Sequence, residues 1–297
     1  MIRFEQVCRR FGRTVAVDGV SLDIPAGDSV ALWGGNGAGK TTLLRCALGL
    51  LRFGGRITLG GHDVRRHGKR ARMLVGYVPQ ELGFYDELRV SEAIRFFATL
   101  KGVVASLSEV LHQVGLTGSE GKRIRELSGG MKQRLALGIA LLGDPPVLIL
   151  DEVTASLDAC GREELVGLLR GLSGSGRTML FASHRVEEVS VLARRVVVME
   201  AGKTRTICDA QAFAARHADD GVLHLSLPVE LRDRAIAILS AGGLAVRRNG
   251  VGVLVRLPPE RRAEPFRLLE SAGVSVSDFR LLRTDATWSV ERQEAHP

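Results

Sequence analysis

Short apolar runs and helically spaced apolar positions alternate along the first two thirds of the chain. Continuous apolar runs of this kind are typical of strands buried on both faces of a largely parallel sheet. They occupy residues 29–33, 74–78, 147–150, 179–182 and 196–199. Residues 15–24 read as a further strand, closed by a turn. The pattern predicts an α/β core over residues 1–210.

Helical spacing dominates a long stretch inside this core. From about residue 86 to residue 142, apolar side chains recur every three or four positions, as in Ile94, Phe97 and Ala98. Strand-like sequence resumes only at residue 147. The spacing therefore predicts a helical subdomain, about 86–142, inserted between strands of the core.

The last quarter of the chain carries a second pattern, after a polar stretch at residues 211–220. Its expected elements are strands at 222–227, 244–248, 251–257 and 274–282 and helices at 230–240 and 259–272. A hairpin turn is expected at Asn249 and Gly250. This βαββαβ order predicts a small ferredoxin-like domain over residues 221–284, with a frayed tail after Thr284. We expect it to regulate the protein or to stabilise a dimer; a passive appendage is the alternative.

The composition is typical of ordinary globular proteins. Of the 297 residues, 45% are hydrophobic and 25% are charged. No apolar run approaches the ~20 residues that cross a bilayer, and the sequence after Met1 lacks the apolar core of a signal peptide. We expect a cytoplasmic protein that works at a membrane only by docking onto another chain. The cysteines are widely spaced, which predicts reduced thiols rather than disulfides or a metal site: Cys8, Cys46, Cys160 and Cys208.

A net charge of +8 allows for an acidic partner, and part of the excess lies in residues 65–72. Such a basic segment can bind nucleic acid or anionic lipid headgroups. No aromatic residues interleave with it for base stacking, which favours a solvated surface. The sequence therefore predicts no nucleic-acid partner.

A phosphate-binding loop is the strongest chemical signal. Residues 34–41 fill the pattern G-x-x-x-x-G-K-[ST], after an apolar strand and before a helix expected at 42–51. In such a loop, backbone N–H groups surround phosphate oxygens, Lys40 reaches the β- and γ-phosphates, and the Thr41 hydroxyl binds Mg²⁺. The pattern predicts a nucleoside triphosphate and Mg²⁺ as ligands. The candidate contacts are Gly34, Gly35, Asn36, Gly37, Ala38, Gly39, Lys40, Thr41 and Thr42.

Two carboxylates, Asp151 and Glu152, follow the apolar strand at 147–150. Alone, this pattern is as often a solvated strand end as a metal site. With a phosphate loop in the same chain, the carboxyl end of the strand faces the nucleotide. We then expect Asp151 to hold Mg²⁺ and Glu152 to orient or deprotonate the attacking water.

Residues 127–133 read Leu-Ser-Gly-Gly-Met-Lys-Gln. Ser128 can cap the helix that starts near Gly130, and such a helix start is a second anion-binding site. The segment resembles the LSGGQ signature of the ATP-binding subunit of ABC transporters, except at Met131 and Lys132. That subunit has a P-loop NTPase core with an inserted helical subdomain.

The resemblance covers residues 1–205 and implies roles for four further side chains. Phe11 matches the aromatic residue that stacks on adenine, with a core phenylalanine as the alternative. Gln80 matches the Q-loop glutamine, which contacts Mg²⁺ and the water and senses the transport subunit. Asp158 matches the D-loop, and His184 matches the switch histidine that touches the γ-phosphate.

Three positions depart from the family pattern. Gly35 and Val153 stand where the family usually has proline, and Ser156 stands where it usually has glycine. Gly35 loosens the loop without removing an amide donor. The other two bear on the backbone conformation between Glu152 and Asp158, and none of the three removes an expected catalytic side chain.

The resemblance implies an ATPase that works as a dimer and hydrolyses ATP to ADP and phosphate. Catalysis would rest on positioning and charge stabilisation, with Lys40, Gln80, Glu152 and His184 as the acting residues and Thr41, Gln80 and Asp151 on Mg²⁺. Two chains, identical or similar, would close over two ATP molecules. The groups that seal the neighbour's site are Ser128, Gly129 and Gly130.

The sequence of residues 84–93 and the extra C-terminal domain resemble those of the ATP-binding subunits of ABC-2 type exporters. The layout is also similar, less specifically, to the ATPase that serves copper-enzyme maturation in nitrous oxide reduction. Both likenesses imply a multi-spanning membrane subunit as partner, at the inner face of the cell membrane. Two alternatives stay open: a soluble ABC ATPase acting on nucleic acid or the ribosome, and a module that binds ATP only for assembly.

Overall fold

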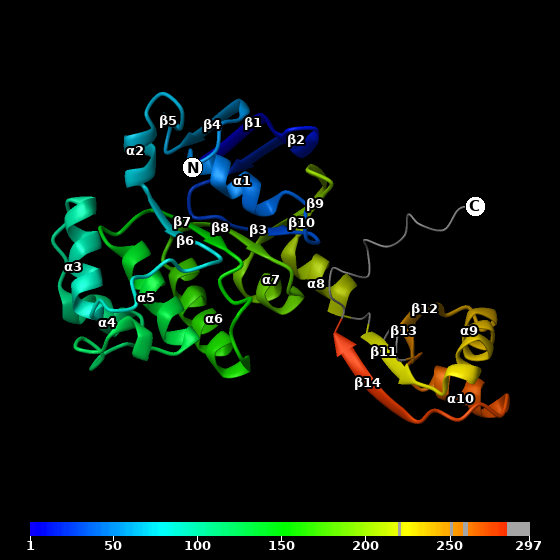
Figure 1. Ribbon diagram of the computed structural model, residues 1–297. Helices are drawn as coiled ribbons and strands as arrows, with labels where there is room; N and C mark the ends of the chain where they lie inside the picture. The colour runs from blue at the N-terminus through cyan, green and yellow to red at the C-terminus, as the bar shows by residue number, and fades with distance from the viewer. Residues whose placement is uncertain (219–220, 250–251, 258–260, 284–297) are drawn as a thin grey trace. The chain divides into compact units, whose positions relative to one another are not determined.

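The computed structural model describes residues 1–218, 221–249, 252–257 and 261–283. The chain divides into two compact units, Met1–Ala210 and Gln211–Pro297 (Figure 1). Among the described residues, no helix is both long enough and apolar enough to pass through a bilayer.

The first unit is built on a six-stranded sheet with the strand order β10-β9-β3-β8-β7-β6. Its strands are β3 (Ser29–Trp33), β6 (Val75–Val78), β7 (Val147–Asp151), β8 (Thr178–Ser183), β9 (Arg195–Glu200) and β10 (Lys203–Asp209). All neighbours pair in parallel except β9 and β10, which are antiparallel. Every residue of β3, β7 and β8 is buried, as the continuous apolar runs predict. The predicted α/β core is confirmed.

A second, antiparallel sheet has the order β2-β1-β4-β5. It consists of β1 (Ile2–Phe11), β2 (Thr14–Ile24), β4 (Gly54–Leu59) and β5 (His62–Asp63). The strand expected at 15–24 therefore belongs to a separate sheet. In Figure 1 this sheet and helix α1 (Lys40–Ala47) lie on one side of the parallel sheet. Helices α5 (Gly129–Leu141), α6 (Ala159–Gly174) and α7 (Val186–Leu192) lie on the other.

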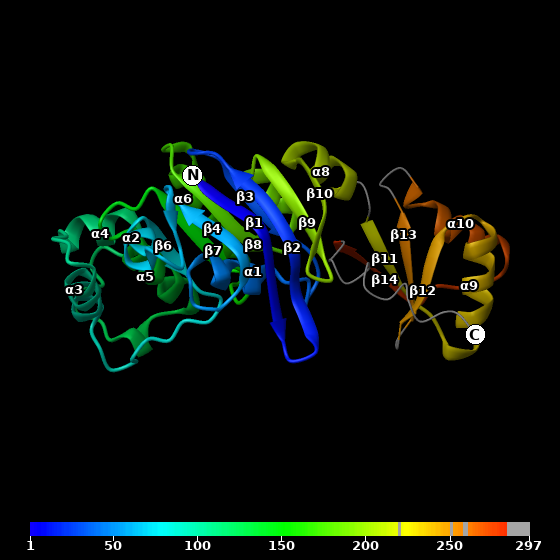
Figure 2. The same ribbon diagram turned by 90° about the horizontal axis from the view of Figure 1, so that it is seen from above.

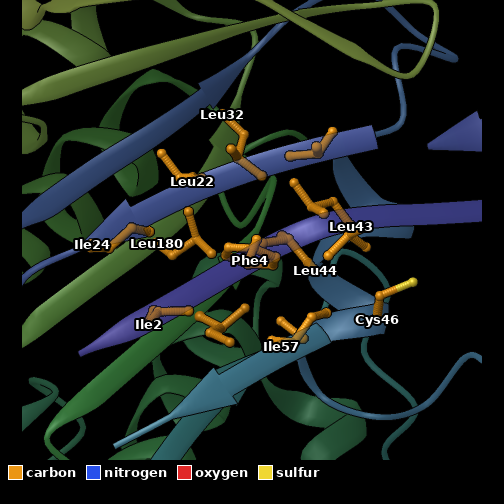
Figure 3. Close-up of a cluster of buried hydrophobic side chains, with 14 of the residues drawn as sticks. Ile2, Phe4, Leu22, Ile24, Leu32, Leu43, Leu44, Cys46, Ile57 and Leu180 are labelled. Carbon is orange, nitrogen blue, oxygen red and sulfur yellow. The ribbon is translucent and has the colours of Figure 1, made fainter. Parts of the chain in front are cut away.

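A hydrophobic cluster joins the two sheets through α1 (Figure 3). It includes Phe4 of β1, Leu32 of β3, and Leu43 and Leu44 of α1, each at most 1% exposed. Burial of one such side chain contributes about 1.5–3 kcal/mol. The cluster therefore fixes the start of α1, and with it the loop that precedes the helix. The helix starts at Lys40 and ends at Ala47, whereas the sequence pattern places it at 42–51.

The expected helical insertion lies between β6 and β7. It contains α3 (Val90–Lys101), α4 (Leu107–Gln113), a 3₁₀ turn η1 (Ile124–Glu126) and α5. The remaining helices are α2 (Gly68–Met73) and α8 (Ala210–Ala218).

The second unit has an antiparallel sheet in the order β12-β13-β11-β14. Its elements are β11 (Gly221–Ser226), η2 (Val229–Leu231), α9 (Arg232–Ala241), β12 (Ala245–Asn249), β13 (Gly252–Leu257), α10 (Glu264–Ser271) and β14 (Asp278–Arg283). Figure 2 shows α9 and α10 on one face of the sheet. The element order agrees with the predicted βαββαβ pattern, with β14 starting four residues later than expected; the ferredoxin-like assignment stays a prediction. Gly250 of the expected turn and the tail from Thr284 lie outside the described residues.

Candidate functional site

Residues 34–39 form the loop between β3 and α1, in the strand–loop–helix order that a phosphate-binding loop requires. A Cβ atom on Gly34 would lie 2.4 Å from the carbonyl oxygen of Met199. One on Gly39 would lie 2.3 Å from the carbonyl oxygen of Ala16, and the φ of Gly39 is +100°. Only glycine fits at these two positions, because neighbouring backbone approaches both.

Lys40 is the first residue of α1, and its side chain is 5% exposed. Its Nζ donates to the carbonyl oxygens of Gly34 at 2.8 Å and Gly35 at 3.3 Å. The same ammonium lies 3.1 Å from Oε1 of Glu152. Lys40 thus joins the glycine loop to the end of β7.

Thr41 and Asp151 form the second contact between α1 and β7. The Thr41 hydroxyl donates to Oδ1 of Asp151 at 2.9 Å. Asp151 is fully buried, and its Oδ2 has no hydrogen-bond partner among the described residues. Burial is the main reason that the pKa of Asp151 is raised. A buried carboxylate oxygen without a partner, beside a hydroxyl, is a donor set that fits Mg²⁺.

Glu152 lies between Lys40 and His184. Besides Lys40, the Nδ1 of His184 is 3.6 Å from Oε2 of Glu152. The contact with His184 is the chief cause that lowers the pKa of Glu152 to about 2, with Lys40 adding to it against the opposing effect of burial. The same contact raises the pKa of His184. Glu152 is therefore a carboxylate at neutral pH, and its contact with His184 favours the protonated form of this histidine.

The backbone at Glu152 is in the left-handed region, with φ +47°. Non-glycine residues seldom adopt this conformation, which costs of the order of 1–3 kcal/mol. The Glu152 N–H donates to the carbonyl oxygen of Ala182 on β8 at 3.2 Å. The chain therefore bends sharply at Glu152, directly after the strand that carries Asp151.

The ion pair between Glu152 and His184 predicts that the free energy of unfolding depends on pH. The folded-state pKa of His184 is raised from its ordinary 6.5, so the stabilisation is complete below pH 6.5 and is lost as pH rises through the folded pKa. The folded-state pKa of Glu152 is lowered from 4.5 to about 2, so its stabilisation is present above pH 4.5 and is lost as pH falls towards 2. The pair should stabilise the fold most between pH 4.5 and 6.5.

Urea unfolding of the nucleotide-free protein across pH 3–9 measures this contribution. Replacement of Glu152 by glutamine is expected to lower the free energy of unfolding most between pH 4.5 and 6.5 and to bring the pKa of His184 back towards its ordinary value in an NMR titration. An unchanged His184 titration in this variant would contradict the ion pair.

The other predicted residues occupy separate places. Gln80 is exposed and lies two residues beyond the end of β6, at the same carboxyl edge of the sheet as the ends of β3, β7 and β8. Phe11, the last residue of β1, is 45% exposed, with the Arg9 guanidinium 4.4 Å from the centre of its ring. Its exposed ring fits a stacking role, and the alternative of a core phenylalanine is wrong.

The predicted signature and D-loop segments meet at the starts of two neighbouring helices. Ser128 caps α5 by accepting from the N–H of Met131 at 3.2 Å, as the sequence predicts. Asp158 caps α6 by accepting from the N–H of Gly161 at 3.0 Å. A Cβ atom on Gly130 would lie 3.7 Å from the Cα of Gly161, so the two helix starts are close. These segments belong to the same unit but not to the cluster around Lys40.

Sequence reasoning missed one polar cluster beside this site, formed by Thr154, Ser183 and Glu188. Glu188 lies in the first turn of α7 next to Glu187, and in the sequence both look like solvated acids. The structure buries Glu188 and leaves Glu187 exposed. The buried Val189 and Leu192 were the available signal, because they show which side of this helix faces the core.

A glycine loop between a buried strand and a helix, with an Asp-Glu pair at the end of a neighbouring parallel strand, defines a P-loop nucleoside triphosphatase. Comparison with known proteins narrows this class. Residues 17–155 match the ABC transporter family. The chain belongs to the ATP-binding proteins of this family, and it is an ATPase.

Two relatives illustrate the match. The daunorubicin resistance ATP-binding protein DrrA3 of Streptomyces coeruleorubidus is 33% identical over 285 residues, which cover 93% of this chain and 90% of that protein. The linearmycin resistance ATP-binding protein LnrL of Bacillus subtilis is 32% identical over 233 residues, or 76% of this chain and 75% of that protein. Among solved structures, a dimeric ATP-binding cassette in a post-hydrolysis state with ADP and Pi shares the fold, with a TM-score of 0.64 and 23% identity over 71% of this chain and 99% of that one.

Proposed function

We propose that this chain is the ATP-hydrolysing subunit of an ABC exporter and that residues 1–210 are its ATPase domain. The observation that carries the proposal is the pair of contacts that joins α1 to β7: Thr41 with Asp151, and Lys40 with Glu152. Glu152 in turn contacts His184, which follows β8. These contacts gather, at one edge of the sheet, the groups that phosphoryl transfer to water needs. The names of the relatives, which are resistance and Nod factor export proteins, support the assignment to export.

Each group has a distinct proposed role in hydrolysis. The loop amides and Lys40 bind the phosphates of ATP, and Thr41, Asp151 and Gln80 hold Mg²⁺, which neutralises phosphate charge when bound. Glu152 orients the attacking water as a hydrogen-bond acceptor. Because its pKa is lowered to about 2, it stays ionised and is a weak base towards that water. His184, whose pKa is raised by its contact with Glu152, donates to the γ-phosphate.

A dimer is proposed as the working form. Ser128, Gly129 and Gly130 sit at a helix start, where backbone N–H groups favour an anion, and would seal the ATP of a second protomer. Asp158 would act at the same junction, and Phe11 would stack on adenine. A closed dimer that binds ATP more tightly than ADP can drive a multi-spanning membrane subunit between two states. The second chain is a copy of this one or a similar ATPase.

Purification of the chain by itself, and from membranes of the cells that produce it, tests this function. We expect Mg²⁺-dependent ATP turnover by the purified chain and co-purification with a multi-spanning membrane protein. Salt-dependent binding to RNA or DNA with no membrane partner would instead support a soluble ABC ATPase. The link to copper-enzyme maturation stays a prediction, which the identity of the neighbouring genes tests.

The C-terminal unit is proposed to be a regulatory or dimer-stabilising accessory domain at 221–284. It has a hydrophobic core of its own, including Leu225, Leu239, Val255 and Leu269, each at most 1% exposed. Deletion of residues 212–297 is therefore expected to leave the ATPase unit folded but to weaken ATP-induced dimerisation several-fold or to change coupled ATPase activity. Light scattering and turnover of the truncated chain measure this, and unchanged values for both would support a passive appendage.

A further inference from the structure

A buried carboxylate, Glu188 of α7, bridges two segments of the ATPase unit. It is 6% exposed. Its Oε2 accepts from the Ser183 hydroxyl at 2.7 Å, and its Oε1 accepts from the Thr154 hydroxyl in a short hydrogen bond. The Ser183 hydroxyl in turn accepts from the N–H of Arg185 at 3.0 Å. Both hydroxyl groups therefore donate their hydrogen bonds to the same carboxylate.

The two segments are those that carry the proposed reacting groups. Thr154 follows Glu152 by two residues, and Ser183 directly precedes His184. A buried carboxylate is unfavourable unless hydrogen bonds compensate for lost hydration, so its two hydroxyl partners are held firmly. The only cation within 4 Å that the described residues record for Glu188 is Arg185, whose Nε is 3.7 Å from Oε1. The link that Glu188 makes between the two segments thus depends mainly on the hydroxyl groups of Thr154 and Ser183.

We infer that Glu188 is a positioning residue that sets the distance and orientation between Glu152 and His184. The inference rests on the proposed function of these two residues. The Thr154 hydrogen bond to Glu188 also restrains the segment after Glu152, where Val153 and Ser156 stand in place of the proline and glycine of the family pattern.

Thr154→Val tests this role without a change of charge and with little change of side-chain volume. We expect kcat for ATP hydrolysis to fall about tenfold, because a small misplacement of a reacting group is costly. The KM for ATP should stay within about twofold of the parental value, because the substitution leaves the phosphate-binding loop unchanged. Thr178→Val is the matched control: Thr178 is also buried, and its hydroxyl accepts from the N–H of Gly27 at 3.0 Å on another part of the unit. This control should keep its kcat.

An NMR titration of His184 separates positioning from a general loss of stability. The charged groups facing His184 are Glu152 from the end of β7 and Arg185 and Glu188 from the start of α7, with Lys40 beyond Glu152. All of these charges remain in Thr154→Val. A shift of the His184 pKa towards its ordinary value in this variant, and not in Thr178→Val, would therefore report a displaced Glu152. Ser183→Ala is the second charge-neutral variant, for use if Thr154→Val fails to fold.

The outcomes distinguish this inference from the proposed function. If the parent protein hydrolyses ATP while Thr154→Val and Ser183→Ala keep the parental kcat and His184 titration, the positioning role is overturned and the function stands. Equal losses of kcat in Thr154→Val and Thr178→Val would overturn it too. If the parent protein has no ATPase activity, the proposed function fails, and the His184 titration alone decides whether Glu188 positions the pair.

Discussion

Glu152→Gln is expected to retain ATP binding, to lower ATP turnover at least a hundredfold and to accumulate an ATP-bound dimer. Glutamine has nearly the same shape as glutamate, so the loop at 34–41 and Lys40 should still bind phosphate. The neutral amide orients an attacking water less strongly than a carboxylate whose pKa is about 2. Loss of one such preorganised polar group costs about 10²–10³ in kcat. ATP that cannot be hydrolysed then keeps the dimer closed.

Phosphate release, nucleotide binding by calorimetry and light scattering with and without ATP measure the three effects. Glu109→Gln, an exposed glutamate on α4, removes the same charge away from the site and should behave like the parent protein. Unchanged turnover in Glu152→Gln would refute the role given to Glu152. Loss of ATP binding in this variant would mean that its partner Lys40 had also been displaced.

Lys40→Met is expected to weaken ATP binding about a hundredfold or more. The Lys40 side chain is 5% exposed. The substitution preserves much of its aliphatic part and removes the ammonium group, which contacts the loop carbonyls and Glu152. A charge-assisted hydrogen bond is worth about 1.5–3 kcal/mol, and 2.8 kcal/mol corresponds to a hundredfold change in Kd. The variant also leaves Glu152 with one cation fewer, so the pKa of this carboxyl should rise.

Titration with ATP in the presence of Mg²⁺ gives the Kd for ATP of Lys40→Met and of the parent protein. Lys203→Met is the matched control, because Lys203 is an exposed lysine on β10 that lies 3.3 Å from Asp18. A surface ion pair of this kind contributes little, and the control should bind ATP as the parent protein does. Equal ATP affinity in Lys40→Met and the parent protein would show that the loop does not use Lys40 for phosphate.

Most of the fold could be predicted because its signals are local. The buried strands β3, β7 and β8 each appear as a continuous apolar run, and the loop at 34–39 is marked by its glycines and by Lys40. Element ends were less accurate. Helix α1 already begins at Lys40, because the chain turns at Gly39, whose φ of +100° no spacing of apolar residues can reveal.

The separate antiparallel sheet was not predicted as such. Strand β2 looks like other strands in the sequence, but it pairs with β1 and not with any strand of the parallel sheet. The choice depends on the cluster around α1, where Phe4, Leu22 and Leu43 become buried together. Pairing between strands is decided by which apolar faces can be buried at once, and this information is spread over the whole unit.

The residue types of the site and their places at strand and helix ends follow from the sequence by itself, since loop chemistry and capping depend on neighbours in the chain. Only the tertiary structure brings Thr41 to Asp151 across 110 residues and sets His184 beside Glu152. Only it shows that Glu188 is buried and Glu187 is not. The physical reason is that burial and ion pairing act between segments that meet only when the hydrophobic faces of sheets and helices pack together.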